Sequence, residues 1–366
     1  MKTLFVKTTL IFLSLLLVST KLYSQYPRYI NIFNYSTDAR QAAMGGDSQG
    51  SLDGPSYIFP IREIMSNNTI LSSFSIRPPN WNSADFLPFH TIGIQKDFDS
   101  TITAGAYIAR NTSGIQIPIS QNVSTFHGNV EPYQLYAVGF VNFLVDEDLS
   151  IGLAGKLYSG NNSPFILIGY SQSGEGRVQG TAYMADIAIQ KRFTLINELN
   201  ERKIIFLRAG LSNLGTWIRY TDDLIFQVPR SFHIDVILYK QFELYSLMYN
   251  GHTRMVLNAV SDDERYYVNT GMEAGYKNIL FGRVGMFLNP YASLFGSKNS
   301  PRFTFGLGLK LKNHSVSERS RFQLTFDFAA VPLTKADYPT LILRENTFNY
   351  IFSTSLIYPI SWSEPF

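Results

Sequence analysis

The sequence predicts an all-β transmembrane fold: a closed antiparallel β-barrel of about fourteen strands, with an N-terminal plug containing short helices. Three observations lead to this fold class. Aromatic residues make up 14% of the 366 residues, and aromatic girdles line both interfaces of a membrane barrel. Many segments alternate apolar and polar residues with a period of two. The connections between these segments alternate between short and long, as they do in outer-membrane barrels.

Residues 1–24 are predicted to be a secretory signal peptide. Lys2 and Lys7 provide a positively charged start, and an apolar run from Leu10 to Val18 follows them. This run is too short to cross a bilayer as a helix, which needs about 20 residues. Without residues 1–24 the chain has 28 basic and 28 acidic residues, so its charge indicates no nucleic-acid partner.

Residues 25–67 are predicted to form the plug. Ser36 or Thr37 can cap an alanine-rich helical turn, and Gly45 can end that turn in a left-handed conformation. Pro60 suits the first position of a second short helix. Because alternation of the β type begins only after this segment, we expect residues 25–67 to lie inside the barrel formed by residues 68–366.

The same segment resembles the N-terminal entry of FadL-like (OMPP1-type) barrels, and within them it is most similar to the PorV/PorQ group of type IX secretion proteins. The resemblance covers residues 38–46, 51–53 and Pro60. A second similar patch comprises residues 209–215 with Tyr220 and Pro229. The group usually has Asn-Pro-Ala where this chain has Phe59-Pro60-Ile61.

Fourteen segments are predicted to be strands. In one example, Phe303, Phe305 and Leu307 alternate with Thr304 and Gly306, which gives one apolar face for lipid and one polar face for the lumen. A serine at Gly306 is therefore expected to cost much less stability than an arginine at Leu307. The predicted strands are residues 69–77, 90–98, 101–110, 132–145, 149–159, 178–193, 203–219, 229–241, 244–259, 264–276, 279–289, 301–313, 320–331 and 346–358.

The connections predict which end of the barrel faces outward. The short ones are expected on the periplasmic side and the long ones on the extracellular side. The long loops include apolar stretches at residues 115–119 and 165–168. These stretches extend strands, fold over the lumen or dock another protein, and the sequence leaves these alternatives open.

No enzymatic, metal or cofactor site is predicted. The five histidines are spread along the chain without a neighbouring set of carboxylates, and each is assigned to a loop or to the polar lumen. Motifs for serine hydrolases, zinc proteases and phosphate binding are absent from the sequence. Cysteine is absent as well, which excludes disulfides and a cysteine-linked lipid anchor. The enzyme alternative is a membrane lipid hydrolase whose triad is dispersed along the chain.

Charged residues that alternate with apolar ones are expected in the lumen, because a charge that faces lipid costs a few kcal/mol. Three roles are open for these residues. They hold the plug in place, they line a path for a ligand, or they form ion pairs in a water-filled interior. Arg40 and Arg62 are candidates to pair with Glu273 or Asp327, and the sequence does not assign the partners. The complete set of plug and lumen candidates is Asp38, Arg40, Met44, Gly45, Gly46, Asp53, Pro60, Arg62, Arg208, Asn213, Gly215, Glu273, Arg283, Lys310 and Asp327, with Lys156 as a further inward-facing charge.

The resemblance implies an outer-membrane protein of a Gram-negative bacterium that assists type IX secretion by carrying or docking exported proteins. Its expected partners are outer-membrane lipid, secretion-system components and exported proteins. Two alternatives remain: passive transport of a hydrophobic small molecule through the lumen, and a structural surface barrel. An apolar interior beside the plug favours a small ligand, whereas a charged and blocked interior favours a protein partner.

Overall fold

The computed structural model describes residues 39–44, 69–76, 89–98, 101–112, 133–161, 179–196, 202–219, 225–226, 228, 230–242, 244–258, 266–288, 301–312, 323–332 and 348–359. The predicted signal peptide (1–24), the apolar loop stretches and most of the predicted plug (25–67) lie outside the described residues.

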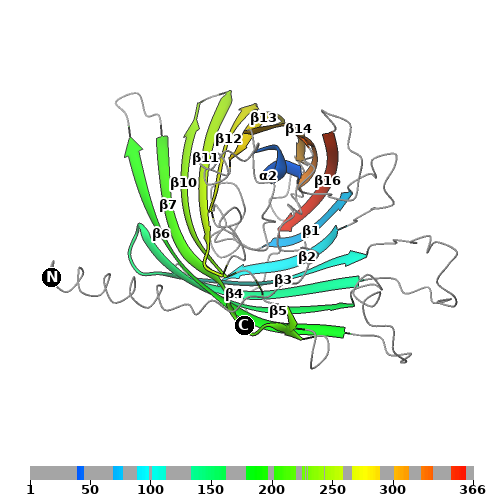
Figure 1. Ribbon diagram of the computed structural model, residues 1–366. Helices are drawn as coiled ribbons and strands as arrows, with labels where there is room; N and C mark the ends of the chain where they lie inside the picture. Colours follow the sequence, from blue (N-terminus) through cyan, green and yellow to red (C-terminus); the bar gives the residue numbers. More distant parts are fainter. Residues whose placement is uncertain are drawn as a thin grey trace, which may run out of the picture.

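The described part is one helical turn, α2, and an extensive sheet (Figure 1). The elements are α2 (Ala39–Ala43), β1 (Thr69–Ile76), β2 (Phe89–Asp97), β3 (Ile102–Thr112), β4 (Tyr133–Leu144), β5 (Leu149–Asn161), β6 (Gln179–Ile196), β7 (Arg202–Gly215), β8 (Ile218–Arg219), β9 (Ile225–Phe226), β10 (Ser231–Gln241), β11 (Tyr245–Val256), β12 (Tyr266–Tyr276), β13 (Leu280–Leu288), β14 (Arg302–Lys312), β15 (Gln323–Pro332) and β16 (Phe348–Pro359).

All strands belong to one sheet, and the pairings between them are antiparallel. The fourteen long strands follow the order β5-β4-β3-β2-β1-β16-β15-β14-β13-β12-β11-β10-β7-β6, and β5 also pairs with β6 along 13 residue pairs. Each long strand of the described part therefore has a hydrogen-bonded partner on both sides. Each of the fourteen predicted strands coincides with one of these long strands, with ends that differ by a few residues.

One predicted strand is interrupted. Residues 203–219 were expected to be continuous, but β7 ends at Gly215, and the short β8 pairs with β6 through Thr181 and Arg219. At this break the register against β6 shifts by one residue, between the pairs Met184–Gly215 and Thr181–Arg219. A separate bulge lies earlier in β7, where the register against β6 shifts between Ala185 and Ile187. Asn213 lies in this bulge with φ of 60°, and such a bulge bends the strand. Neither β8 nor β9 was expected as a separate element.

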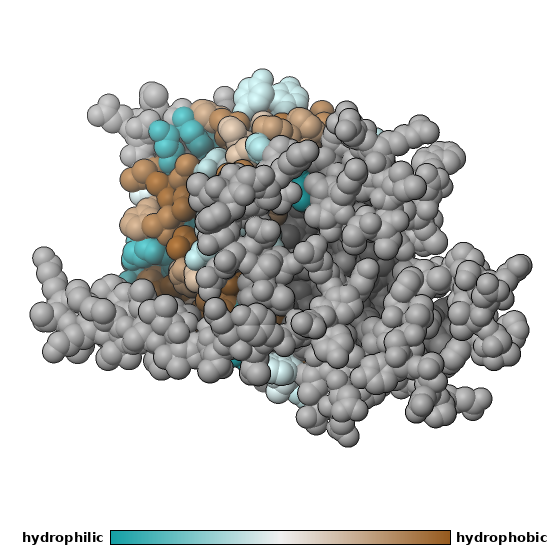
Figure 2. Space-filling view, viewed as in Figure 1, coloured by the Kyte–Doolittle hydropathy of each residue, from teal (hydrophilic) through white to brown (hydrophobic). Residues whose placement is uncertain are grey.

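The two faces of the sheet differ in chemistry. One face is apolar and exposed: on β14, Phe303, Phe305 and Leu307 are between 50% and 66% exposed. The opposite face carries buried residues, among them Thr304 and Lys310 on the same strand. Figure 2 shows hydrophobic residues along the left side of the molecule, on the side where Figure 1 places β6 and β7. No helix among the described residues is long and apolar enough to cross a membrane.

Short and longer connections alternate along the chain as the sequence predicts, except that the 10 residues between β14 and β15 outnumber the 9 between β11 and β12. Residues 145–148 join β4 to β5, and residues 277–279 join β12 to β13. In the first of these turns, Asp146 Oδ1 accepts bonds from Asp148 N at 2.8 Å and Leu149 N at 2.6 Å. These two backbone bonds lower the pKa of Asp146, because they stabilise its ionised form.

Candidate functional site

Helix α2 lies against the buried face of the sheet, next to β13, β14 and β16 in Figure 1. Its residues Ala39, Ala42 and Ala43 are fully buried and form an apolar cluster with Ala329, Val331 and Ile351. Alanine has the highest helix propensity, but a helix of five residues is not stable alone. The helix therefore depends on its contacts with β15 and β16. We call the wall that receives it the α2 seat, formed by β12 to β16.

Glycines in the seat allow the helix backbone to come close. A Cβ at Gly271 would lie 2.6 Å from Met44 Cβ, and a Cβ at Gly306 would lie 2.6 Å from Phe328 O and close to Ala43 Cβ. A serine at Gly306 would meet these atoms, and the sequence alone does not show this contact because it does not show what lies above the position. Only glycine fits under α2 at these two places without a shift.

We predict that Gly271→Ala displaces α2, because overpacking of a tight contact costs about 1–3 kcal/mol. The chain has no cysteine, so a single Ala42→Cys can report the position of the helix through its labelling rate with N-ethylmaleimide. Labelling should be faster in the Gly271→Ala background. Gly155→Ala is the matched control, since a Cβ at Gly155 meets nothing within 4 Å, and equal rates in both variants would contradict the close fit.

Hydroxyl groups of the wall bind both ends of α2. Ala39 N donates to Ser353 Oγ at 3.2 Å, and Thr304 Oγ1 donates to Ala43 O at 2.8 Å. A helix end leaves backbone groups without partners inside the helix. The wall supplies a partner at each end, which fixes the position of the turn along the strands.

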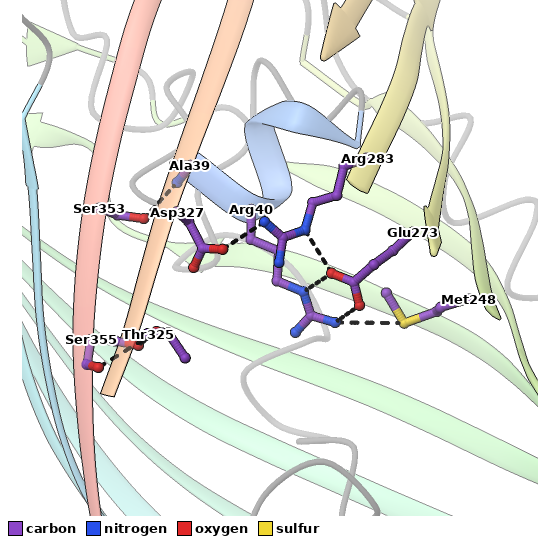
Figure 3. Close-up of polar contacts among 9 residues, drawn as sticks. All are labelled: Ala39, Arg40, Met248, Glu273, Arg283, Thr325, Asp327, Ser353 and Ser355. Carbon is purple, nitrogen blue, oxygen red and sulfur yellow. Dashed lines mark hydrogen bonds and ion pairs between the residues drawn. The ribbon is translucent and has the colours of Figure 1, made fainter. Parts of the chain in front are cut away.

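Four charged side chains connect α2 to the wall (Figure 3). Arg40 donates from Nε to Glu273 Oε2 and from Nη2 to Oε1, both at 2.7 Å. Arg283 donates from Nε to Glu273 Oε2 and from Nη1 to Asp327 Oδ1, both at 2.6 Å. The side chains of Glu273 and Arg283 are 7% and 3% exposed. We call these four residues the charge network.

The strand register explains why the network forms. Glu273 of β12 lies directly opposite Arg283 of β13, and Asp327 of β15 lies opposite Gly308 of β14. A Cβ at Gly308 would lie 2.5 Å from both Arg283 Nη1 and Asp327 Oδ1. The missing side chain at Gly308 therefore leaves the space through which Arg283 reaches across β14 to Asp327.

An apolar cluster adjoins the charge network. Met44, which follows α2, packs with four buried wall residues and with the partly buried Tyr239. Met248 belongs to this cluster, and its Sδ lies 3.9 Å from Arg40 Nη2. We call the wall part of this cluster the apolar wall; it comprises Ile204, Phe206, Ile237, Tyr239 and Met248.

A second polar group lies at the β7 bulge. Lys156 forms an ion pair with Asp186, and its Nζ donates to Asn213 Oδ1 at 3.1 Å. Asn213 N donates to Asp186 Oδ1 at 2.8 Å. The lysine and the aspartate are almost completely buried, so together they compensate each other's charge and hold the bulged backbone.

Two histidines lie close together, although the sequence separates them. The rings of His233 and His252 are 5.3 Å apart, on the neighbouring strands β10 and β11. His252 pairs with Asp235, and Ser231 Oγ is 2.7 Å from His233 Nε2. Ser231 and His233 are fully buried, so this structure gives a substrate no access to the pair. Among the described residues no three His, Cys, Asp or Glu side chains are arranged to hold a metal.

The sequence candidates are distributed as follows. Arg40, Glu273, Arg283 and Asp327 form the charge network, and Met44 contacts the apolar wall. Arg208 lies on the same face and donates from Nε to Gln190 Oε1 at 2.7 Å. Three further candidates are described. Asn213 lies in the bulge, and the carbonyl of Gly215 accepts a hydrogen bond from Arg230 Nη2 at 2.9 Å. Lys310 Nζ lies 3.4 Å from Asn278 Oδ1. Asp38, Gly45, Gly46, Asp53, Pro60 and Arg62 lie outside the described residues.

Sequence reasoning missed several residues of the seat, including Gly271, Thr304, Gly308 and Ser353. Each lies at one of the alternate strand positions that face inward, and this alternation was the only signal of them that the sequence contains. The alternation gives the face of the sheet on which a residue lies. It does not give the position of the residue relative to α2, so it could not show that these residues contact the helix.

Comparison with known proteins gives structural similarity only; no protein-family model and no curated protein matches the sequence. The toluene transporter TodX of Pseudomonas putida is 11% identical with a TM-score of 0.44, over 89% of this chain and 98% of that chain. A FadL homologue of Pseudomonas aeruginosa is 10% identical with a TM-score of 0.41, over 90% and 96%. OccK2 of the same species is 8% identical with a TM-score of 0.36, over 81% and 97%. The proposals below are therefore based on this chain's own residues.

Proposed function

We propose that the chain is a closed outer-membrane β-barrel whose N-terminal segment occupies the lumen. Three features of the described part support this proposal. The pairing of β5 with β6 joins the two ends of the strand order. The apolar face of the sheet is exposed, as a lipid-facing surface must be. The buried face carries ion pairs, which are costly in lipid and suit an interior.

We further propose that this barrel passes a small apolar molecule across the outer membrane. The observation that carries the proposal is the apolar wall beside α2, where Met44 covers Phe206, Met248 and their neighbours. Ligand sites are lined mainly by apolar side chains with a few polar groups. Met44 takes the place in which an apolar ligand would contact this wall, and movement of α2 would free it.

Binding of a small apolar fluorophore tests the proposal. N-phenylnaphthylamine should bind to the full-length protein in phosphatidylcholine nanodiscs, and Phe206→Ser should weaken this binding about tenfold, since a buried aromatic side chain supplies more than 1.4 kcal/mol of contact. Leu207→Ser is the matched control, because Leu207 is the next residue of the same strand and faces the other side, 42% exposed. If both variants bind like the wild type, the apolar wall is not the binding surface.

Type IX secretion is the second candidate function. It is supported by the resemblance of residues 38–46 to the PorV/PorQ group and by the charge network, which gives part of the interior a charged character. In this case the barrel would carry or dock exported proteins. Purification from detergent-solubilised outer membranes tests it: recovery of secretion-system components with the wild type favours this role, and recovery of the barrel alone counts against it.

The orientation in the membrane follows from the turn lengths. With single cysteines in this cysteine-free chain, Ser163→Cys should react with a membrane-impermeant maleimide on intact cells, because it lies in a long connection. Glu147→Cys lies in the short turn between β4 and β5 and should react only after the outer membrane is permeabilised. The opposite pattern would invert the orientation.

A further inference from the structure

The α2 seat and the neighbouring apolar wall present an acidic group and an apolar surface side by side. Arg40 of α2 contacts Glu273, and Met44 packs on the apolar wall. Residues four apart lie on the same side of a helical turn. The two surfaces meet at Met248, which belongs to the apolar wall and whose Sδ is 3.9 Å from Arg40 Nη2.

Glu273 of the seat accepts hydrogen bonds from two guanidinium groups, those of Arg40 and Arg283. Arg283 donates to both Glu273 and Asp327, so the wall alone holds two carboxylates and one guanidinium in this network. Arg40 adds the second positive charge. Glu273 is almost completely buried, and without Arg40 its Oε2 keeps the bond from Arg283 while its Oε1 loses the bond from Arg40 Nη2. A buried charged oxygen that loses its donor is destabilised. Withdrawal of Arg40 therefore favours entry of another cation and opposes entry of an anion.

The geometry also selects the kind of cation. Arg40 forms a two-point contact, with Nε on Oε2 and Nη2 on Oε1, each at 2.7 Å. A planar guanidinium fits a carboxylate in this way, whereas an ammonium acts as a point charge.

We infer that the α2 seat and the apolar wall together form a binding site for a small cationic amphiphile, with a guanidinium group on Glu273 and an apolar body on the apolar wall. Arg40 and Met44 together occupy the positions of the two parts of this ligand, so α2 is a built-in competitor for the site. This inference rests on the proposed function, because it names the chemical class of the molecule that the lumen receives.

Three probes with the same apolar body test the charge preference. Phenethylguanidinium, the neutral phenethylurea and the anionic phenylpropionate are compared by equilibrium dialysis against the full-length protein in phosphatidylcholine nanodiscs, with empty nanodiscs as the blank. The guanidinium probe should bind about tenfold more tightly than the urea, the gain expected from hydrogen bonds to a charged partner. The anion should bind more weakly than the urea.

Two variants assign the preference to Glu273. Glu273→Gln should bring the ratio of guanidinium to urea affinity close to one, whereas Asp146→Asn, the same change in an exposed turn, should retain it. Equal binding of the guanidinium and urea probes to the wild type would overturn the inference and leave the proposed function standing. If neither these probes nor N-phenylnaphthylamine binds, both are overturned.

A chemical rescue gives an independent test that does not need Glu273→Gln to fold. In Ala42→Cys, free methylguanidinium should compete with Arg40 and speed labelling of the cysteine. In Ala42→Cys with Arg40→Ala, it should fill the space left beside Glu273 and slow the labelling. Methylurea should change neither rate. The same direction of effect in both backgrounds would indicate general destabilisation and would overturn the inference.

Discussion

Leu307→Arg is expected to destabilise the proposed outer-membrane barrel by about 2–4 kcal/mol, the cost of an arginine that faces lipid near the middle of a membrane strand. Leu307 is the sixth of the 11 residues of β14 and is 66% exposed on the apolar face. Urea unfolding in lipid vesicles measures the change. The physical reason is that the guanidinium has no water and no carboxylate partner at this depth.

Leu311→Arg is the control for depth. Leu311 lies on the same face of the same strand, next to its last residue, Lys312. There an arginine reaches the interface, where the cost falls to about 0–1 kcal/mol. If the two variants lose equal stability, the apolar face of β14 is not in contact with lipid.

Arg283→Met is expected to cost about 3–5 kcal/mol, because removal of one partner from a buried ion pair leaves the other charge uncompensated. Arg283 is the cation that Glu273 and Asp327 share, and its side chain is 3% exposed. The variant leaves Arg40 as the remaining cation of the charge network. Urea unfolding of the reconstituted protein measures the loss.

Arg192→Met is the matched control on the surface. Arg192 pairs with Asp148 at 3.5 Å, and the two side chains are 33% and 42% exposed. An exposed pair contributes about 0–1 kcal/mol, so this variant should stay close to the wild type. A loss at Arg283 no larger than the loss at Arg192 would show that the charge network does not stabilise the fold.

The strands could be predicted from the sequence because the two faces of the sheet differ in polarity, so apolar and polar residues alternate along each strand. On β14, the alternation of Phe303, Phe305 and Leu307 with Thr304 and Gly306 gave both the strand and its faces. The break after Gly215 could not be predicted in the same way. It coincides with a one-residue change of register against β6 between Gly215 and Arg219, and register is set by the partner strand.

The site was predictable only as a set of residues on one face. Arg40, Glu273 and Asp327 were expected inside, but their pairing was open. The structure pairs Arg40 with Glu273, while Asp327 goes to Arg283, because Gly308 leaves a passage across β14. The passage exists because glycine has no side chain at the point where Arg283 crosses β14. Its location depends on the register between neighbouring strands, and a single sequence does not give that register.

The hydrogen bond from Ala39 to Ser353 joins residues separated by 314 positions, and this separation sets an order of assembly. Ser353 belongs to β16, so its hydroxyl reaches the seat only after the C-terminal strand has paired with β15. Contacts between distant residues form late in folding because a long loop must close first. The part of the chain that is synthesised early is therefore among the last to find its place, and in the proposed outer-membrane barrel it would cross the periplasm without the wall that later holds it.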